Sequence, residues 1–275
     1  MLGTLTLCGT PIGNLADLSE RAAETLRSAD VIFAEDTRRT GRLLQHLGVT
    51  IPMKSFFAGN EKARLDLLRR ELEVGSSVVL VSDAGMPVVS DPGASAVEVA
   101  VDVGAAVHVV PGPSAVVTAL AVSGFDGDRF VFDGFLPRKG GARTRAIERI
   151  AVEQRTLVLF AAPSRVAVDL ADLATVDPDR RIVVTRELTK MYEEIWRGSL
   201  GEAADHWSTH GTAKGEFTLV IEGASERVIS IDDALVVVSE LIAEGSSTSD
   251  AVRSVATDLG VSRRALYERV VNAGT

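Results

Sequence analysis

Short apolar runs alternate with helix-like segments at the start of the chain, and this alternation constrains the fold more than any other feature. Runs rich in β-branched residues at 31–34, 77–81 and 106–110 are each followed by a segment with apolar residues at helical spacing. Buried strands separated by amphipathic helices form parallel sheets, because each helix carries the chain back across the sheet in a right-handed crossover. We therefore expect an α/β first lobe over residues 1–123 with a mostly parallel sheet.

Three of the predicted strands end in loops rich in glycine and proline. These loops read CGTPIGN (8–14), SDAGMPVVSDPG (82–93) and PGPSA (111–115). Glycine and proline mark abrupt turns, and ligands of open α/β sheets bind at the carboxyl ends of the strands. The three loops are therefore expected to form the walls of one small-molecule pocket.

The second half of the chain has a different pattern. Its predicted strands lie at 130–132, 156–160, 181–185, 193–198 and 216–221. The last two alternate charged with bulky residues, as half-exposed or antiparallel strands do, and from residue 232 the pattern is wholly helical. We expect a second α/β lobe with a mixed sheet at 124–228 and a small helical appendage at 229–275.

Helix starts are predicted from residues that favour the capping position. Asp17, with Glu20 three residues later, is expected to begin the first helix. Asn60 is placed to cap a later helix, and Ser249 and Ser262 to cap helices of the appendage.

Composition places the chain among ordinary soluble proteins, with 46% hydrophobic and 24% charged residues. No apolar run approaches the roughly 18 residues of a membrane span, and the first residues lack a basic segment before an apolar one. We expect a cytoplasmic protein without a membrane partner. The single cysteine, Cys8, excludes an internal disulfide, and four scattered histidines give no metal-ligand spacing, so no metal is expected.

The net charge of −9 argues against nucleic acid as a partner, but its distribution does not. Residues 71–128 contain no Lys or Arg, whereas residues 133–150 carry five basic residues against two acids. A phosphate backbone responds to such a local basic stripe rather than to the average charge.

The first loop does not match the common nucleotide-binding patterns. GTPIG (9–13) has neither the dinucleotide-binding spacing of glycines nor the Gly-Lys ending of a P-loop, and residues 8–20 contain no cation for a pyrophosphate. A ligand with a positive centre and no phosphate, such as S-adenosylmethionine, suits these walls better. Asp83 and Asp91 lie nearby, and Ile12, Met86 and Val89 offer apolar contacts. Simple tight turns are the alternative.

Seven motifs, taken in order, resemble the ribosomal RNA small subunit methyltransferase I family of the tetrapyrrole methylase superfamily. They are TPIGNLAD (10–17), AEDTR (34–38), SDAGMP (82–87), PGPSA (111–115), GFLP (134–137), RELTK (186–190) and KGE (214–216). The resemblance runs from about residue 5 to 223, with a similar helical tail. It implies a two-lobed tetrapyrrole-methylase-like fold, S-adenosylmethionine as cofactor between the lobes, 2′-O-methylation of a cytidine ribose in 16S rRNA of the small ribosomal subunit, and a homodimer.

The superfamily's cofactor positions transfer only where the motifs match. They fall in the three glycine-rich loops and after a strand of the second lobe. Together with Asp83, the predicted cofactor-binding residues are Ile12, Met86, Val89, Ser114, Ala115, Ala161 and Ala162.

Two segments depart from the family pattern. Many members carry Glu-Ser-Pro-His-Arg where this chain reads AAPSR (161–165), and His often precedes Asn-Glu where it reads FAGNE (57–61). If the protein is active, neither the missing Glu nor the missing His is essential.

Candidates for catalysis lie at two predicted strand ends. Methyl transfer to a hydroxyl depends on alignment and gains from a positioned base or ammonium group. Asp36 is interpreted as a base or an orienter of the ribose, with a helix-capping carboxylate as the alternative, and Arg38 as a contact to phosphate or a nucleobase rather than plain surface. Glu187 and Lys190 are either catalytic or an ordinary surface pair.

The predicted RNA contacts are Arg39, Asn60, Arg138, Lys139 and Arg143. For Asn60 the alternative is a simple N-cap. The basic residues of the tail, Arg263, Arg264 and Arg269, form either a second RNA contact or a solvated helix face.

Two other functions remain open from the sequence. A relative that methylates a carbon of a tetrapyrrole, such as a precorrin, would need a broad apolar trough. A catalytically silent RNA-binding module would explain the absence of the family's Glu and His.

Overall fold

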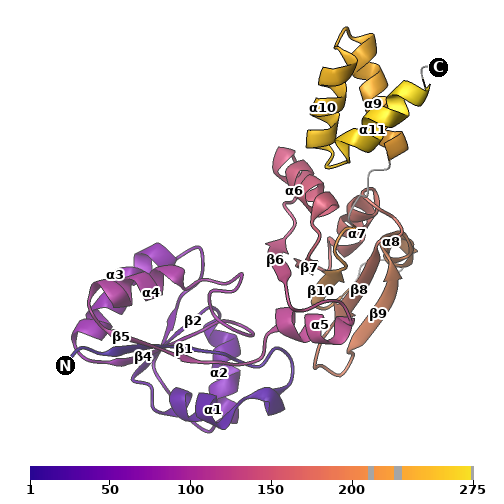
Figure 1. Ribbon diagram of the computed structural model, residues 1–275. Coiled ribbons are helices and arrows are strands. Elements are labelled where there is room, and N and C mark those ends of the chain that lie inside the picture. Colours follow the sequence, from indigo (N-terminus) through magenta and orange to yellow (C-terminus); the bar gives the residue numbers. More distant parts are fainter. Residues whose placement is uncertain (210–213, 226–230, 274–275) are drawn as a thin grey trace. The chain divides into compact units, whose positions relative to one another are not determined.

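A computed structural model of the protein describes residues 1–209, 214–225 and 231–273. The chain divides into two compact units, Met1–Ala224 and Ser225–Thr275. The first unit contains both expected lobes (Figure 1). The boundary expected between residues 228 and 229 lies outside the described residues.

The first lobe is built on a five-stranded sheet. Its strands, in the spatial order β3-β2-β4-β1-β5, are β3 (Met53–Ser55), β2 (Val31–Ala34), β4 (Ser77–Val81), β1 (Thr4–Cys8) and β5 (Ala106–Val110). Every neighbouring pair is parallel, which confirms the predicted sheet.

Helices cover both faces of this sheet because alternate residues of its strands are apolar on both sides. Val78 and Leu80 face the core under α3 (Glu61–Glu73) and α4 (Ala94–Asp102). Val79 and Val81 face the core under α1 (Glu20–Arg27) and α2 (Thr37–His46), on the opposite side (Figure 1).

Two helix caps differ from the prediction, and a third lies at the predicted residue without the expected side-chain bond. Ser19, not Asp17, caps α1, since its hydroxyl accepts a hydrogen bond from the Ala22 amide at 3.1 Å. Asn60 holds the capping position of α3 but its side chain makes no cap bond there. Ser247, not Ser249, caps α10 (Thr248–Asp258).

The second lobe contains the predicted mixed sheet. Its strands, in spatial order, are β6 (Phe130–Phe135), β7 (Thr156–Ala161), β10 (Phe217–Ile221), β8 (Arg181–Arg186) and β9 (Glu194–Ser199). β6 and β7 are parallel, and the other three pairs are antiparallel.

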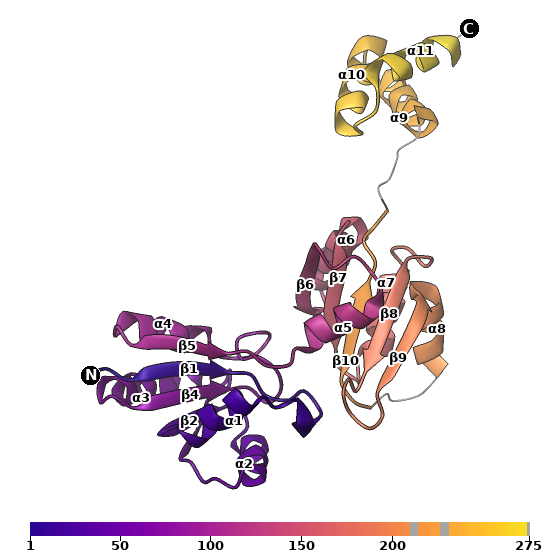
Figure 2. The ribbon, with the colours of Figure 1, turned by 60° about the horizontal axis from the view of Figure 1, so that its bottom comes forward.

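The helix that follows β5 crosses to the second lobe. α5 (Ala115–Ser123) buries Val116 and Leu120 with Val158 and Val220 of the second sheet (Figure 2). The other face of that sheet carries α6 (Gly141–Val152), α7 (Val166–Ala174) and α8 (Leu200–Thr209). The chain therefore passes from the first lobe to the second before α5. β5 is an edge strand, and the helix that follows it packs on the sheet of the second lobe.

The second unit consists of α9 (Ile231–Ala243), α10 and α11 (Arg263–Ala273), packed around Val238, Val252 and Leu266. Within the described ranges of the whole chain, no helix has the length and hydropathy that crossing a membrane requires.

Candidate cofactor and substrate site

A cavity of about 340 Å³ lies between the loops of the first lobe and the strands of the second. It is lined by Ile12, Ala84, Gly85, Met86, Val89, Ser90, Asp91, Ser114, Ala115, Val116, Phe135, Phe160, Ala161, Ala162, Pro163, Leu188, Glu216, Phe217 and Thr218. All three glycine-rich loops contribute, as the sequence predicted. The size falls in the range of small-molecule sites.

Seven of the eight predicted cofactor residues line this cavity: Ile12, Met86, Val89, Ser114, Ala115, Ala161 and Ala162. Asp83 does not. One of its carboxylate oxygens accepts a hydrogen bond from the Asp36 amide at 2.9 Å, so its side chain joins the ends of β4 and β2 instead. The structure therefore places Asp83 outside the lining of this cavity, and its contact with the cofactor stays a prediction.

Close backbone contacts fix the three loops against one another. The amides of Thr10 and Gly85 each donate to the other residue's carbonyl, at 2.9 and 3.0 Å. The Gly112 amide donates to the sulfur of Met86 at 3.3 Å. A Cβ at Gly9 would lie 2.6 Å from the Gly112 backbone, so this approach requires glycine.

The loop between β4 and α4 adopts an unusual backbone. Val88 and Ser90 have φ values of 77° and 63°, which residues other than glycine rarely adopt. Glu61 holds the far end of the loop, accepting hydrogen bonds from the Gly93 amide at 3.2 Å and the Ser95 hydroxyl at 2.6 Å. Strain of this kind persists only where surrounding contacts impose it, and it is frequent at functional sites.

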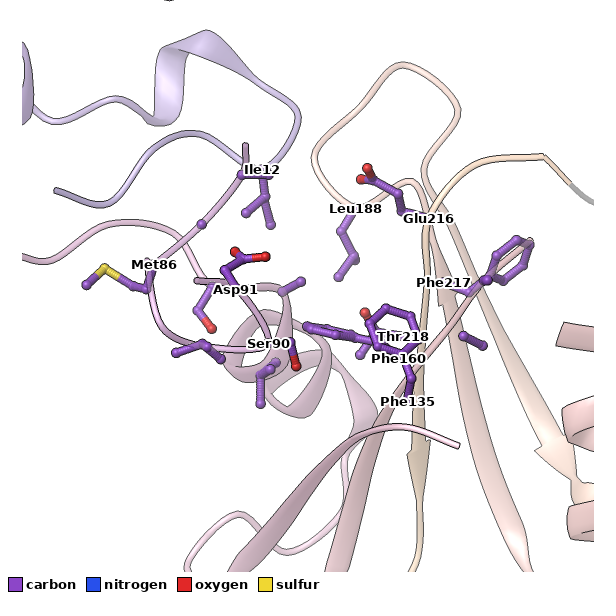
Figure 3. Close-up of a pocket in the computed structure, with 18 of the residues that line it drawn as sticks. Ile12, Met86, Ser90, Asp91, Phe135, Phe160, Leu188, Glu216, Phe217 and Thr218 are labelled. Atoms are coloured by element: carbon purple, nitrogen blue, oxygen red, sulfur yellow. The ribbon is translucent and has the colours of Figure 1, made fainter. Parts of the chain in front are cut away.

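The second lobe supplies lining residues that the sequence reasoning missed. Phe135, Phe160, Leu188 and Glu216 face Ile12 and Asp91 across the cavity (Figure 3). Phe135, Leu188 and Glu216 each fall within one of the seven motifs, GFLP, RELTK and KGE, which indicate a resemblance but no role for these side chains. Their chemistry could have been found by asking which strand ends face the first lobe.

The described residues that line the cavity include two carboxylates, Asp91 and Glu216, and no Lys, Arg or His. Burial raises the pKa of Asp91 to about 6, and the charge of Glu35 adds to the rise, while a hydrogen bond from Ser82 opposes it. Burial also raises the pKa of Glu35. Asp91 has no ion-pair partner among the described residues, and a carboxylate in such surroundings favours a positively charged ligand.

Glu187 and Lys190 form an ion pair at the end of β8. The Lys190 ammonium donates to Glu187 at 2.7 Å and to Glu216 at 2.8 Å. Burial works to lower the pKa of Lys190, but the bonds to Glu187 and Glu216 outweigh it and raise the pKa. A Cβ at Gly13 would lie 2.4 Å from the Lys190 side chain, so the segment that follows β8 contacts the first loop of the first lobe.

Asp36 caps α2 as in the alternative interpretation, accepting a hydrogen bond from the Arg38 amide at 2.8 Å. The Arg38 guanidinium also donates to it at 2.7 Å, and this bond is the main reason that the pKa of Asp36 lies well below its usual range. The Nε of Arg39 lies 3.6 Å from a carboxylate oxygen of Asp83. Arg39, Arg42 and Asp83 line a smaller hollow of about 150 Å³ next to the loops that the cavity shares.

The predicted RNA contacts divide into exposed and committed side chains. Arg138 and Lys139 are exposed on the loop before α6. Asn60 is committed to its own loop, accepting from the Phe57 amide and donating to Ser55. The prediction for Arg143 is wrong, because its side chain is buried and donates to Asp169 at 2.9 Å and Asp172 at 2.6 Å.

Two of the arginines in the tail are paired within the second unit. Arg264 donates to Glu268 and Arg269 donates to Asp232, both at 3.0 Å. These pairs are what a solvated helix face would show.

Comparison with known proteins relates most of the chain to one family. The family model of the Tetrapyrrole (Corrin/Porphyrin) Methylases matches residues 4–204. The chain is 42% identical over 271 residues to ribosomal RNA small subunit methyltransferase I of Synechocystis sp., covering 97% of each chain. It is 37% identical over 274 residues to the Bacillus subtilis protein of the same name, covering 97% of this chain and 94% of the relative.

A solved structure agrees in fold. Uroporphyrin-III C-methyltransferase from Thermus thermophilus, complexed with S-adenosylhomocysteine, matches with a TM-score of 0.57 at 19% identity. The match covers 79% of this chain and 96% of that one.

Proposed function

Because the chain belongs to the ribosomal RNA small subunit methyltransferase I family of the tetrapyrrole methylases, we propose that it methylates the 2′-hydroxyl of a cytidine ribose in 16S rRNA. Similarity along 97% of both chains, with the cavity formed by the family motifs, is the observation that carries this proposal. S-adenosylmethionine is the proposed cofactor.

The residues of the cavity fit this cofactor. A sulfonium nucleoside has a positive centre and no phosphate. The described lining combines apolar side chains with the carboxylate of Asp91 and contains no Lys, Arg or His, while Glu216 is paired with Lys190. Ile12, Met86, Val89, Ser114, Ala115, Ala161 and Ala162 would hold the cofactor. When bound, it supplies an electrophilic methyl group, and the related enzyme in complex with S-adenosylhomocysteine supports the same use of the fold.

Cationic side chains outside the cavity suit the RNA. Arg38 and Arg39 lie at the start of α2, and Arg138 and Lys139 on the loop before α6. Guanidinium and ammonium groups at these places would contact phosphates, which position a nucleic acid without reading its sequence. The proposed substrate is the small ribosomal subunit or its 16S rRNA.

Alignment of the ribose oxygen with the methyl group provides most of the rate acceleration, because such alignment supplies about 7–11 kcal/mol. Asp36 orients rather than accepts a proton, because its pairing with Arg38 makes it a weak base. Lys190 stays charged between Glu187 and Glu216, and we assign these residues to holding the β8 end against the first loop.

We also propose that the protein is a homodimer that works in the cytoplasm, where its rRNA substrate is made. β5 supports a second copy as partner. Val107 and Val109, on one face of this edge strand, are 37% and 56% exposed, and Val101 of the neighbouring α4 is 63% exposed. An apolar edge of this kind aggregates unless it is covered. Antiparallel pairing of β5 with itself about a twofold axis would set Val107 opposite Val109.

The rival functions receive less support. The chain is 19% identical in sequence to the uroporphyrin methyltransferase, against 42% to the rRNA methyltransferase of Synechocystis sp.. A silent RNA-binding module would not need a cation-free cavity formed by loops of both lobes.

Isothermal titration with S-adenosylmethionine, followed by transfer of a labelled methyl group, tests the proposal. Undermethylated small subunits are the substrate, with protein-free rRNA and a precorrin as comparisons. Label in 16S rRNA supports the proposed function. Label in the precorrin alone, or no binding of the cofactor, contradicts it.

A further inference from the structure

Asp91 lies where the cofactor cavity meets the polar loops of the first lobe. Its carboxyl group is turned toward the space between Ile12 and Leu188 (Figure 3). Its other neighbours are Ser82 and Asp83 at the end of β4 and Glu35 at the end of β2. Asp83 in turn lines the hollow that contains Arg39 and Arg42. Asp91 thus lines the cavity, and its neighbour Asp83 lines the hollow on the side of the lobe that carries the proposed RNA contacts.

The charges around Asp91 leave it without a cation of its own. Glu35 and Asp83 are both acidic, and Arg39 is engaged by Asp83 at 3.6 Å. Across the cavity, Glu216 is neutralised by Lys190. In the described part of the chain, no Lys or Arg forms an ion pair with Asp91.

The loop that carries Asp91 is held in one shape. Ser90, directly before it, has a φ of 63°, and the Val88 amide closes the loop by donating to the Pro92 carbonyl at 3.4 Å. Glu61 fixes the following Gly93. A carboxylate on so constrained a loop is positioned before any substrate arrives, which is the condition for proton transfer within a reaction.

We propose that Asp91 is the general base that accepts the proton of the ribose 2′-hydroxyl, an assignment that rests on the proposed function. The O–H bond breaks and its proton moves to the carboxylate, while the oxygen pair forms the new bond to the methyl carbon. The pair of the broken carbon–sulfur bond stays on sulfur. The negative charge of Asp91 and the positive charge of the sulfonium are thereby both neutralised.

The other carboxylates are less suited to this role. Asp36 is bound by Arg38, Glu187 and Glu216 share Lys190, and Asp83 does not reach the cavity. The raised pKa of Asp91 makes it a stronger base than an ordinary aspartate while it stays largely ionised above pH 7.

Asp91→Asn tests the assignment, because it removes the base and keeps the shape. We expect the single-turnover rate of methyl transfer to undermethylated small subunits to fall by about 10²–10⁴-fold. The rate is measured at saturating S-adenosylmethionine, and calorimetry without RNA determines separately how far the loss of this cavity carboxylate weakens cofactor binding. Asp102→Asn is the control, since Asp102 is exposed on α4 of the same lobe and should leave both quantities unchanged.

A second variant keeps the base and changes its surroundings. Glu35→Gln preserves an oxygen for the Asp83 amide but removes a charge that raises the pKa of Asp91. The pH profile of the single-turnover rate should rise to a plateau, and Glu35→Gln should move its midpoint to lower pH. A purely structural role for Asp91 would not produce this shift.

The outcomes separate the assignment of Asp91 from the proposed function. Wild-type rates in Asp91→Asn, or a loss of rate explained wholly by weaker cofactor binding, would overturn the assignment of Asp91 as base. An unmoved midpoint in Glu35→Gln would do the same. Failure of the wild-type protein to methylate ribose would overturn the proposed function itself.

Discussion

The guanidinium of Arg143 lies 2.9 Å from the carboxylate of Asp169, with both side chains more than nine-tenths buried. This pair joins α6 to α7, and Asp172 and the Pro137 carbonyl complete the contacts of Arg143. An arginine in a basic segment thus stabilises the second lobe instead of meeting a phosphate.

Arg143→Ala should lower the free energy of unfolding by about 3–5 kcal/mol, because it leaves Asp169 charged and buried without its partner. Urea unfolding measures the loss. Arg145→Ala, at an exposed position of the same helix, should stay within about 0.5 kcal/mol of wild type. Equal stability of the two variants would contradict the structural role of Arg143.

The double variant Arg138→Ala with Lys139→Ala should bind rRNA more weakly and with a flatter salt dependence, while cofactor affinity stays unchanged. The slope of log affinity against log salt should fall by about 1 for each phosphate that these side chains no longer neutralise. Arg69→Ala, on α3, is the comparison. A slope that stays at the wild-type value would remove this loop from the RNA interface.

Gly9→Ala should destabilise the first lobe and weaken cofactor binding. The added Cβ would lie 2.6 Å from Gly112 and 2.7 Å from the Met86 sulfur, so the loops that wall the cavity must move apart. A cost of about 1–3 kcal/mol is expected in chemical unfolding. Gly41→Ala is the matched control, because its Cβ would meet only the Met53 side chain at 3.6 Å.

Asp91→Asn should make the cofactor-free protein more stable above pH 6, by about 1–2 kcal/mol after allowance for partial exposure. The folded state holds the Asp91 proton more tightly than the unfolded chain, so stability falls as pH rises from about 4 through the pKa of about 6. The variant lacks this decline. Thermal unfolding between pH 4 and 8 tests it, and parallel curves for the two proteins would contradict the raised pKa.

Val109→Asp should dissociate the proposed dimer by placing a charge on the apolar edge of β5. Analytical ultracentrifugation measures the mass. Val74→Asp, at a more exposed valine that follows α3, should remain dimeric. A monomeric wild-type protein, or a dimeric Val109→Asp, would contradict β5 as the interface.

Local patterns predicted the fold well, and the site only in part. Strands such as β4 are apolar on both faces, so burial could be read directly from the residues of 78–81. The glycine-rich loops likewise indicated the first-lobe wall of the cavity. The roles of Asp83 and Arg143 could not be predicted, because both depend on partners far away in the sequence. Asp83 binds the amide of Asp36, 47 positions before it. Arg143 binds Asp169 and Asp172, 26 and 29 positions after it.

The crossing of α5 was also beyond local reading. Its apolar residues, including Val116 and Leu120, fit a helix on either sheet, and only the packing of the second lobe decides which. That crossing leaves β5 exposed and brings Ser114 and Ala115 to the cavity. The packing of α5 on the second lobe thus affects both the proposed dimer edge and the cofactor site.

The most direct test of the proposed function is the chemical position of the transferred methyl group. Undermethylated small subunits are incubated with the protein and methyl-labelled S-adenosylmethionine, and the 16S rRNA is then hydrolysed with alkali. A methyl on a 2′-oxygen blocks cleavage of the adjacent phosphodiester, so the label should appear in an alkali-resistant dinucleotide that begins with cytidine. Label released in single nucleotides, or none in the rRNA, would contradict ribose methylation by this protein.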